Sequence, residues 1–436
     1  MTSSSADETR TDEDAMRPDE SALAAVGALL LEAELSVTDV RDALLHVWRA
    51  GGRDPAPPVA VLPAAVMVGS AGARPGTAMA IVPSQSLTIR QGAHAIRLAH
   101  GLADGGIRLD DAESRVRAIR LMRLAHPDLA WAVGSALVSG GLALVFRCPW
   151  WAIAAATVVG LLLAVVTGLM GRVRPAAALV PFVAAFLSTT ALAVIDAAFG
   201  LGPIPLFAVC APIAILVPGA LITNALLELT ATDIVTGSAR LMYGLIVLGF
   251  MYVGIIAGGA VAGVHVDERS ASLVGATITG AGGGAAWGGV PPAPVAWLGV
   301  VGLALGVCVA FGSGIRLAVV SIVVMLCTYG LLTTLGPAFG APVATGIAGA
   351  VLFVAARLLE RMPLGVPASV MFRPAFLLLV PGTVGLVALA SLGSSSAQAA
   401  VLTFVSLCIG VKAGSVMVDT NWAGAFGRRM PRRYRP

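Results

Sequence analysis

The chain has 436 residues, of which 57% are hydrophobic and 12% are charged. Soluble domains carry about 25% charged residues, so this composition predicts a membrane protein. The net charge of +4 does not suggest a nucleic-acid-binding protein. The five cysteines are scattered in or beside apolar segments without a Cys-x-x-Cys pair, which argues against a zinc site or a disulfide framework.

The first 126 residues differ in composition from the rest. Residues 1–22 are acidic and polar and lack the basic and apolar regions of a signal peptide, so we expect a disordered tail. Residues 23–126 are expected to form a soluble α+β domain. Ser36 resembles a helix cap before a helical pattern that ends at Gly51, and the segments 59–68 and 78–82 resemble two short strands. Further helices are expected at about 85–104 and from Asp110 onward.

Ten apolar segments follow, each about long enough to cross a bilayer core of about 30 Å. We place them at about 128–146, 150–171, 175–198, 203–227, 239–263, 292–311, 317–335, 341–358, 372–392 and 397–418. Nearly all the arginines of the connecting loops, and those of the basic tail at 419–436, fall on one side if both termini are cytoplasmic. The positive-inside rule therefore predicts a multi-pass protein of the inner or plasma membrane with both termini in the cytoplasm.

The ten spans divide into two groups of five, 128–263 and 292–418, on either side of a Gly-rich segment at 264–291 that is expected to be an extracytoplasmic linker. An odd number of spans in each half makes the halves inverted-topology repeats. Two motifs recur at equivalent positions: Leu-Val-Pro-Gly at 216–219 and 379–382, and Gly-x-x-Ala-Gly at 254–258 and 410–414. The alternative is that both motifs recur by chance, because Leu, Val, Gly and Ala dominate the composition.

The Leu-Val-Pro-Gly motifs predict a break in the fourth span of each half. Proline removes a backbone donor, and glycine permits unusual backbone angles. Two matched broken helices point to a transport site between the repeats, where half-helix ends can bind a carboxylate and freed carbonyls an ammonium. The residues expected to bind substrate are Pro218, Gly219, Asn224, Pro381 and Gly382. The alternative is a kink that serves packing alone.

These features resemble the threonine/serine exporter family. The resemblance rests on the N-terminal domain, the two groups of five spans and the two Leu-Val-Pro-Gly motifs, and on Asn224 followed by Asp233-x3-Gly237-x-Ala239-Arg240-Leu241. The segment 31–40 also resembles the family's N-terminal opening, with Glu34 where the family tends to have a small residue. The resemblance covers roughly residues 23–420. It implies export of threonine, serine or similar amino acids, driven by the proton motive force; some relatives export dicarboxylates.

Five ionisable residues are candidates for coupling or gating. Asp196, late in the third span, is either a proton-coupling carboxylate or a residue facing water at the outer surface. Lys412, the single lysine, either pairs with a carboxylate within the tenth span or reaches the inner interface along its four methylenes. Asp233 and Arg240, together with Glu228, either form a cytoplasmic entry gate or lie in a solvated loop.

The sequence lacks catalytic, Walker or metal-binding motifs, so we expect neither an enzyme nor a cofactor. A regulatory or gating role is our first hypothesis for the soluble domain, and a hydrolase is the second. The expected function is a secondary active exporter of threonine and serine that works by alternating access. Its expected partners are protons, the substrate and the lipid bilayer, and a homo-oligomer is an open alternative. The alternatives are a dicarboxylate exporter, a gated passive channel, or a membrane-embedded sensor or enzyme.

Overall fold

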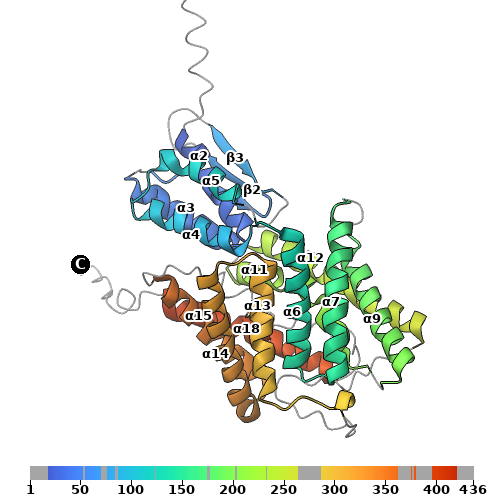
Figure 1. The fold of residues 1–436 in the computed structure, drawn as a ribbon. Helices are drawn as coiled ribbons and strands as arrows, with labels where there is room; N and C mark the ends of the chain where they lie inside the picture. Colours follow the sequence, from blue (N-terminus) through green and yellow to red (C-terminus); the bar gives the residue numbers. More distant parts are fainter. Residues whose placement is uncertain are drawn as a thin grey trace, which may run out of the picture.

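The computed structural model describes most of the chain, and two parts are visible in Figure 1. The described residues are 18–52, 55–69, 76–83, 87–122, 124–173, 177–201, 204–231, 233–263, 286–361, 375, 378–379 and 395–419. Residues 18–122 form a compact unit of helices and strands, which we call the N-terminal unit. Residues from 127 onward form a larger group of helices, which we call the helical bundle.

The N-terminal unit contains four α-helices and one antiparallel sheet. The helices are α2 (Pro18–Glu32), α3 (Val37–Ala50), α4 (Ile89–Ala103) and α5 (Ala112–Arg120), with a 3₁₀ turn η1 (Leu109–Asp111) before α5. The strands are β1 (Val59–Leu62), β2 (Ala65–Gly69) and β3 (Thr77–Ile81), in the order β1-β2-β3. Their inward-facing residues join the helices around a separate hydrophobic core.

Two details of this unit differ from the sequence-based expectation. The segment 59–68 is not one strand but a hairpin, in which Val61 pairs with Val66 and Leu62 with Ala65 across a turn at Pro63 and Ala64. Helix α2 begins at Pro18, within the segment expected to be a disordered tail. Residues 1–17 lie outside the described part.

The helix starts follow from local capping chemistry. The Ser36 hydroxyl accepts a hydrogen bond from the Asp39 amide at 3.1 Å and so caps α3, as the sequence predicts. Thr88 and Gln91 form a reciprocal capping box at the start of α4, a signal that the sequence analysis did not use. Both caps lie on the side of the unit that meets the helical bundle.

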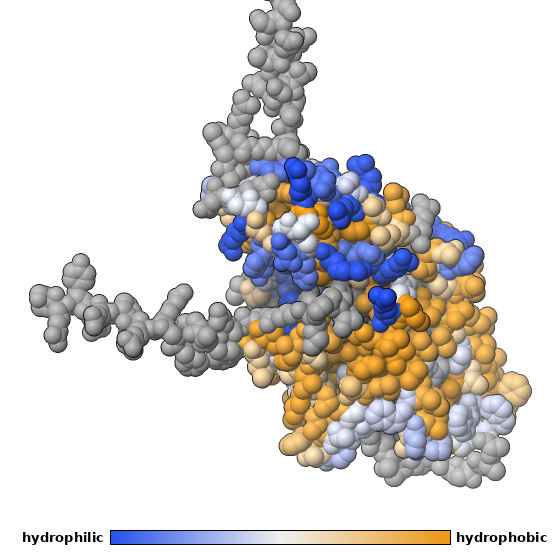
Figure 2. Space-filling model, turned by 60° about the vertical axis from the view of Figure 1, so that its left-hand side comes forward, coloured by the Kyte–Doolittle hydropathy of each residue, from blue (hydrophilic) through white to orange (hydrophobic). Residues whose placement is uncertain are grey.

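The helical bundle consists of long apolar helices. They are α6 (Pro127–Val145), α7 (Trp150–Gly171), α9 (Val180–Phe199), α10 (Leu206–Cys210), η2 (Ala211–Leu216), α11 (Gly219–Thr230), α12 (Ile234–Ala262), η4 (Ala286–Gly288), α13 (Val295–Ala310), α14 (Ile315–Phe339), α15 (Ala341–Arg361) and α18 (Ser395–Asp419). Within the described residues, six helices are long and apolar enough to cross a membrane. Figure 2 shows the apolar surface of the bundle below the more hydrophilic N-terminal unit.

Most expected spans coincide with helices to within a few residues. The fourth expected span, at 203–227, is divided into α10, η2 and α11. The ninth, at 372–392, lies outside the described residues except for positions 375, 378 and 379, and so do most of the linker and the basic tail.

The first helix on each side of the linker packs against its counterpart with opposite direction. A Cβ added to Gly134 of α6 would lie 2.6 Å from the Cβ of Ala310, and one added to Gly141 would lie 2.5 Å from the amide nitrogen of Leu303. The contact therefore moves toward the start of α13 as it moves toward the end of α6. Glycine permits this close antiparallel approach because it has no side chain.

Two other helix pairs use glycine in the same way but run in parallel. In α12, a Cβ on Gly258 would lie 2.7 Å from the carbonyl oxygen of Phe186 in α9. In α18, a Cβ on Gly414 would lie 2.8 Å from the carbonyl oxygen of Ala350 in α15, and Gly410 contacts Gly346 one turn earlier. The two Gly-x-x-Ala-Gly motifs thus make equivalent contacts on either side of the linker.

Candidate functional site

The first Leu-Val-Pro-Gly motif interrupts the fourth span, as predicted. The chain runs through a short α-helix and a 3₁₀ segment, becomes extended at Val217 (φ −67°, ψ 126°), and starts a new helix at Gly219. Proline at 218 has no amide hydrogen, and the Val217 carbonyl instead accepts a hydrogen bond from the Gly219 amide at 2.8 Å. The result is two half-helices with their ends at one break.

The break is half-buried and has open space beside it. Residues 215–219 are neither fully buried nor exposed. A Cβ added to Gly219 would meet no atom within 4 Å, in contrast to the tightly packed glycines of the helix pairs. The Gly219 amide is bonded to the Val217 carbonyl, so the donors that helix geometry leaves without partners inside α11 are the amides that follow Gly219 in its first turn.

The second Leu-Val-Pro-Gly motif falls largely outside the described residues. Leu379 is helical and buried, with 3% of its surface exposed, whereas Pro381 and Gly382 are not described. Their expected role therefore stays a prediction.

Asn224 lies on α11 and faces the N-terminal unit. Its Nδ2 donates a hydrogen bond to the carbonyl oxygen of Glu34 at 2.8 Å. Glu34 itself has a left-handed backbone with φ 64°, in the turn between α2 and α3. The amide of Asn224 thus helps to hold the start of α3 against the bundle.

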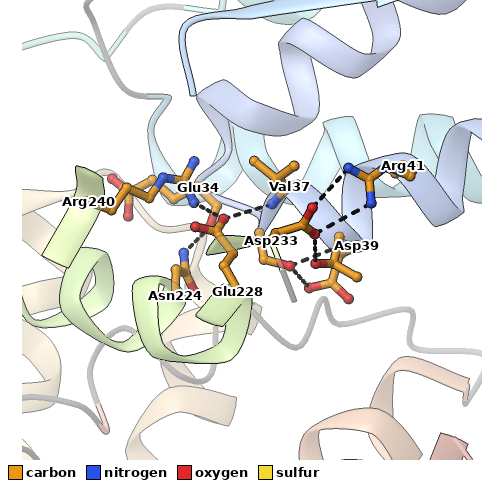
Figure 3. Close-up of polar contacts among 10 residues, drawn as sticks. Glu34, Val37, Asp39, Arg41, Asn224, Glu228, Asp233 and Arg240 are labelled. Atoms are coloured by element: carbon orange, nitrogen blue, oxygen red, sulfur yellow. Dashed lines mark hydrogen bonds and ion pairs between the residues drawn. The ribbon is translucent and has the colours of Figure 1, made fainter. Parts of the chain in front are cut away.

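The end of α11 and the start of α12 form a polar contact with the first turn of α3 (Figure 3). The Glu228 carboxylate is fully buried, and its Oε1 accepts hydrogen bonds from the Val37 amide at 2.9 Å and from the Arg240 guanidinium. A carboxylate at a helix N-terminus is favoured by the free amides and the helix dipole. Among the described residues, Oε2 of Glu228 has no hydrogen-bond partner.

Asp233 makes the second part of this contact. Its carboxylate accepts a hydrogen bond from the Thr38 hydroxyl at 2.8 Å and pairs with the Arg41 guanidinium at 3.1 Å. The three residues of the expected gate thus belong to two separate ion pairs. Arg240 pairs with Glu228, and Asp233 pairs with Arg41 of the N-terminal unit.

The two carboxyl groups have shifted pKa values of opposite sign. Glu228 lies past the expected fourth span; burial raises its pKa, and the Val37 amide and Arg240 only partly oppose this effect. Partial burial would also raise the pKa of Asp233, but the Thr38 hydroxyl and Arg41 outweigh it, so that pKa is lowered. The contact therefore moves the two pKa values apart, that of Glu228 upward and that of Asp233 downward.

The N-terminal unit also contacts helices that follow the linker. The amide of Ile89, at the start of α4, donates to the carbonyl of Phe311 at 2.8 Å, and the side chain of Ile89 belongs to the hydrophobic core of the bundle. Arg357 of α15 donates to the Asp39 carboxylate at 3.2 Å. One small unit thus binds helices from both sides of the linker.

The other two candidate residues lie apart from this contact. Asp196 is half-buried near the end of α9, and its carbonyl oxygen accepts a hydrogen bond from the amide of Gly200 at 2.7 Å. Lys412 is half-buried on α18. Within the described residues, no group of three or more His, Cys, Asp or Glu side chains could hold a metal ion.

Sequence reasoning missed Thr38, Asp39, Arg41 and Arg357 as partners. Each is a polar residue at a helix end or on a helix surface, which a local pattern assigns to solvent. Their partners lie roughly 190 to 320 positions away in the chain, so no local spacing could have identified them.

The apolar helices and the divided fourth span define a polytopic membrane protein, since each helix can satisfy its own backbone inside lipid and a break is tolerated only where protein surrounds it. Residues 21–262 match the family described as "Putative threonine/serine exporter". This match covers more than half of the chain, and the chain belongs to that family. No curated protein and no solved structure gives a significant match.

The family match ends with α12. It includes the N-terminal unit, the first Leu-Val-Pro-Gly motif and the contact around Glu228. The resemblance expected for residues 263–420 lies beyond it.

Proposed function

We propose that this protein is a secondary active exporter of threonine, serine or similar small hydrophilic amino acids, driven by the proton motive force. Its family membership supports the class of substrate. The observation that carries a transport mechanism is the break at Pro218 and Gly219, with half-helix ends beside open space. An amino acid carries both a carboxylate for free amides and an ammonium for free carbonyls.

Alternating access between two inverted five-helix halves is the proposed mechanism. The first helices of the two halves, α6 and α13, pack against each other antiparallel. A two-fold axis in the membrane plane produces this relation. The parallel pairs α9 with α12 and α15 with α18 relate the third and fifth helices of each half. The α6–α13 contact supports an inverted repeat independently of the sequence motifs, and the two parallel pairs show where the Gly-x-x-Ala-Gly motifs make their contacts.

The proposed orientation places the N-terminal unit in the cytoplasm. Arg172, at the end of α7, pairs with Asp128 at the start of α6, only a few residues beyond the unit. Arg240 and Arg357 lie at the same end of the bundle, against the unit itself. Cations therefore gather where the positive-inside rule requires the cytoplasm.

Asp196 and Lys412 remain the proposed coupling residues inside the bundle, and Asp233 and Arg240 the proposed gating residues. Proton coupling requires a carboxylate that can change its charge during the cycle, and Asp196 is a half-buried carboxylate in an apolar helix. Pro381 and Gly382 are proposed to complete the site from the second half.

Counterflow in proteoliposomes tests this function. Purified protein is reconstituted with unlabelled threonine, serine or succinate inside, and uptake of the labelled solute is followed. We expect Gly219→Val to abolish counterflow of threonine and serine, because its side chain fills the open space without a clash. Gly168→Val is the matched control, since a Cβ at Gly168 also meets no atom within 4 Å but lies on α7, four residues before Arg172 at the end of that helix.

The outcomes separate the alternatives. Counterflow of succinate without threonine or serine would indicate a dicarboxylate exporter. Efflux that runs downhill only and is unaffected by a proton uncoupler would indicate a passive channel. Normal counterflow by Gly219→Val would contradict the proposed site, and an absence of flux for all three solutes would contradict the proposed function.

A further inference from the structure

The contacts of the N-terminal unit involve both sides of the linker at one end of the bundle. Before the linker it binds the connection between α11 and α12, through Asn224, Glu228 and Asp233. After the linker it binds Phe311 and Arg357. Any motion that separates these two groups of helices at this end must break one set of contacts.

We infer that the N-terminal unit is a clamp that holds the two halves together at the cytoplasmic end and must release the α11–α12 connection during each transport cycle. This inference rests on the proposed function, because alternating access requires the halves to separate at that end. The clamp stays attached to α13, α14 and α15 and moves with them.

Both sets include a polar contact, that of Arg357 with Asp39 in the second set, but only the second set also buries apolar side chains, and this difference indicates which one opens. At the start of α4, Ile89 and Ala93 are buried in the hydrophobic core of the bundle, so their separation would expose apolar surface. The contact of α3 with the α11–α12 connection is polar, made of the Val37 amide, the Thr38 hydroxyl and Arg41 against two carboxylates. Water can replace these hydrogen bonds at a modest net cost.

The unit can move as one body because it has its own core. Its buried residues from α2, α3, α4, α5 and the sheet form a cluster separate from that of the bundle. Ser36 caps α3 from within the unit, so the helix keeps one cap when Glu228 withdraws. Release therefore does not require unfolding.

Reversible disulfide locks test the clamp. Thr38→Cys with Asp233→Cys joins α3 to the α11–α12 connection, where the native side chains are in hydrogen-bond contact. Thr88→Cys with Gly312→Cys is the matched control and joins the unit to the α13–α14 connection, where a Cβ on Gly312 would lie 3.3 Å from that of Thr88. The parent with its native cysteines receives the same oxidant.

We expect oxidation to reduce counterflow of the 38–233 pair at least tenfold and dithiothreitol to restore it. The 88–312 pair is expected to keep more than about half of its reduced activity. Counterflow of the oxidised 38–233 pair at the level of its reduced form would overturn the inference, and so would equal inhibition by both locks.

A second measurement separates failure of the clamp from failure of the proposed function. If the parent carries none of the three solutes, the proposed function fails, and hydrogen exchange then decides whether the N-terminal unit is held against the α11–α12 connection. We expect amides 37–41 to exchange about tenfold faster in Asp233→Ala than in the parent, since a charge-assisted contact is lost. Asp42→Ala, on the exposed side of the same helix, is the control. Equal exchange in the two variants would overturn the clamp.

Discussion

At the scale of single residues, Glu34 shows how the docking of α3 depends on one unusual backbone conformation. Its φ of 64° is in the left-handed region, which costs a residue with a side chain about 1 kcal/mol or more. The conformation turns the chain from α2 into α3 and presents the Glu34 carbonyl to Asn224. The strain is therefore compensated by contacts between the unit and the bundle.

Glu34→Gly is expected to stabilise the protein by about 1 kcal/mol, because glycine adopts this backbone conformation without strain. Thermal unfolding in detergent measures the change as a higher midpoint. Gly52→Ala is the control with the opposite expected effect. Gly52 has φ 67° and no neighbour within 4 Å of an added Cβ, so only backbone strain can lower the unfolding midpoint of this variant. An unchanged or lower midpoint for Glu34→Gly would show that the Glu34 side chain makes contacts that outweigh the strain.

Glu228 gives the contact a dependence on pH. Burial raises its pKa in the folded protein, so protons bind more tightly there than in the unfolded chain. Its contribution to stability is then fully present below the ordinary value of 4.5 and is lost as the pH rises through the raised pKa. Asp233 has a lowered pKa and loses its contribution only as the pH falls below 3.8.

We expect the stability of the parent to rise, relative to Glu228→Gln, as the pH falls from 8 to 5. The glutamine does not titrate, so the difference between the two unfolding midpoints isolates the proton bound at residue 228. Asp196→Asn measured over the same range is a control for effects of charge elsewhere. A difference between parent and Glu228→Gln that is constant from pH 8 to 5 would contradict a raised pKa in the folded state.

At the scale of elements, the sequence specified the features that arise from local chemistry. Pro218 and Gly219 broke the fourth span because proline lacks a donor wherever it occurs, and Ser36 capped α3 because a hydroxyl at that position needs only its own helix. The hairpin at Pro63 and Ala64 was missed because this turn has neither glycine nor asparagine, the usual signals. The docking contacts were missed because Thr38 meets Asp233 only through tertiary packing.

The equivalent glycine contacts of α12 and α18 predict equivalent effects of substitution. Gly258→Val and Gly414→Val each place side-chain atoms against a neighbouring backbone carbonyl, at 2.7 Å and 2.8 Å from the added Cβ. We expect each to destabilise the protein by about 1–3 kcal/mol through overpacking. Unfolding midpoints in detergent measure the loss, with Gly168→Val of α7 as control, because an added Cβ there meets nothing within 4 Å. A loss in only one of the two variants would argue against equivalent helix pairs.

At the scale of the whole molecule, the break at Gly219 is connected to the N-terminal unit along the direction that crosses the membrane. The break at Gly219 begins α11, and α11 ends at the connection that the unit binds through Glu228. A displacement of α11 at the break is therefore transmitted to the unit through one helix of 12 residues. We therefore expect substrate binding at the proposed site and release of the proposed clamp to be coupled through α11 when that helix moves as a rigid body.

The proposed inverted arrangement requires that the connections alternate between the two sides of the membrane in a fixed order. A background without the native cysteines receives single cysteines at exposed positions, and intact cells are treated with a membrane-impermeant maleimide. Arg172 and Ile315 lie at the end of the bundle that carries the N-terminal unit, whereas Phe199 and Trp287 lie at helix ends on the opposite side. We expect cysteines at 199 and 287 to be labelled in intact cells and those at 172 and 315 only after permeabilisation, because the proposed orientation places the unit and its arginines in the cytoplasm. Labelling of 172 together with 199 in intact cells would contradict a complete crossing by α9, and labelling of 315 but not 287 would mean that the second half is not inverted relative to the first.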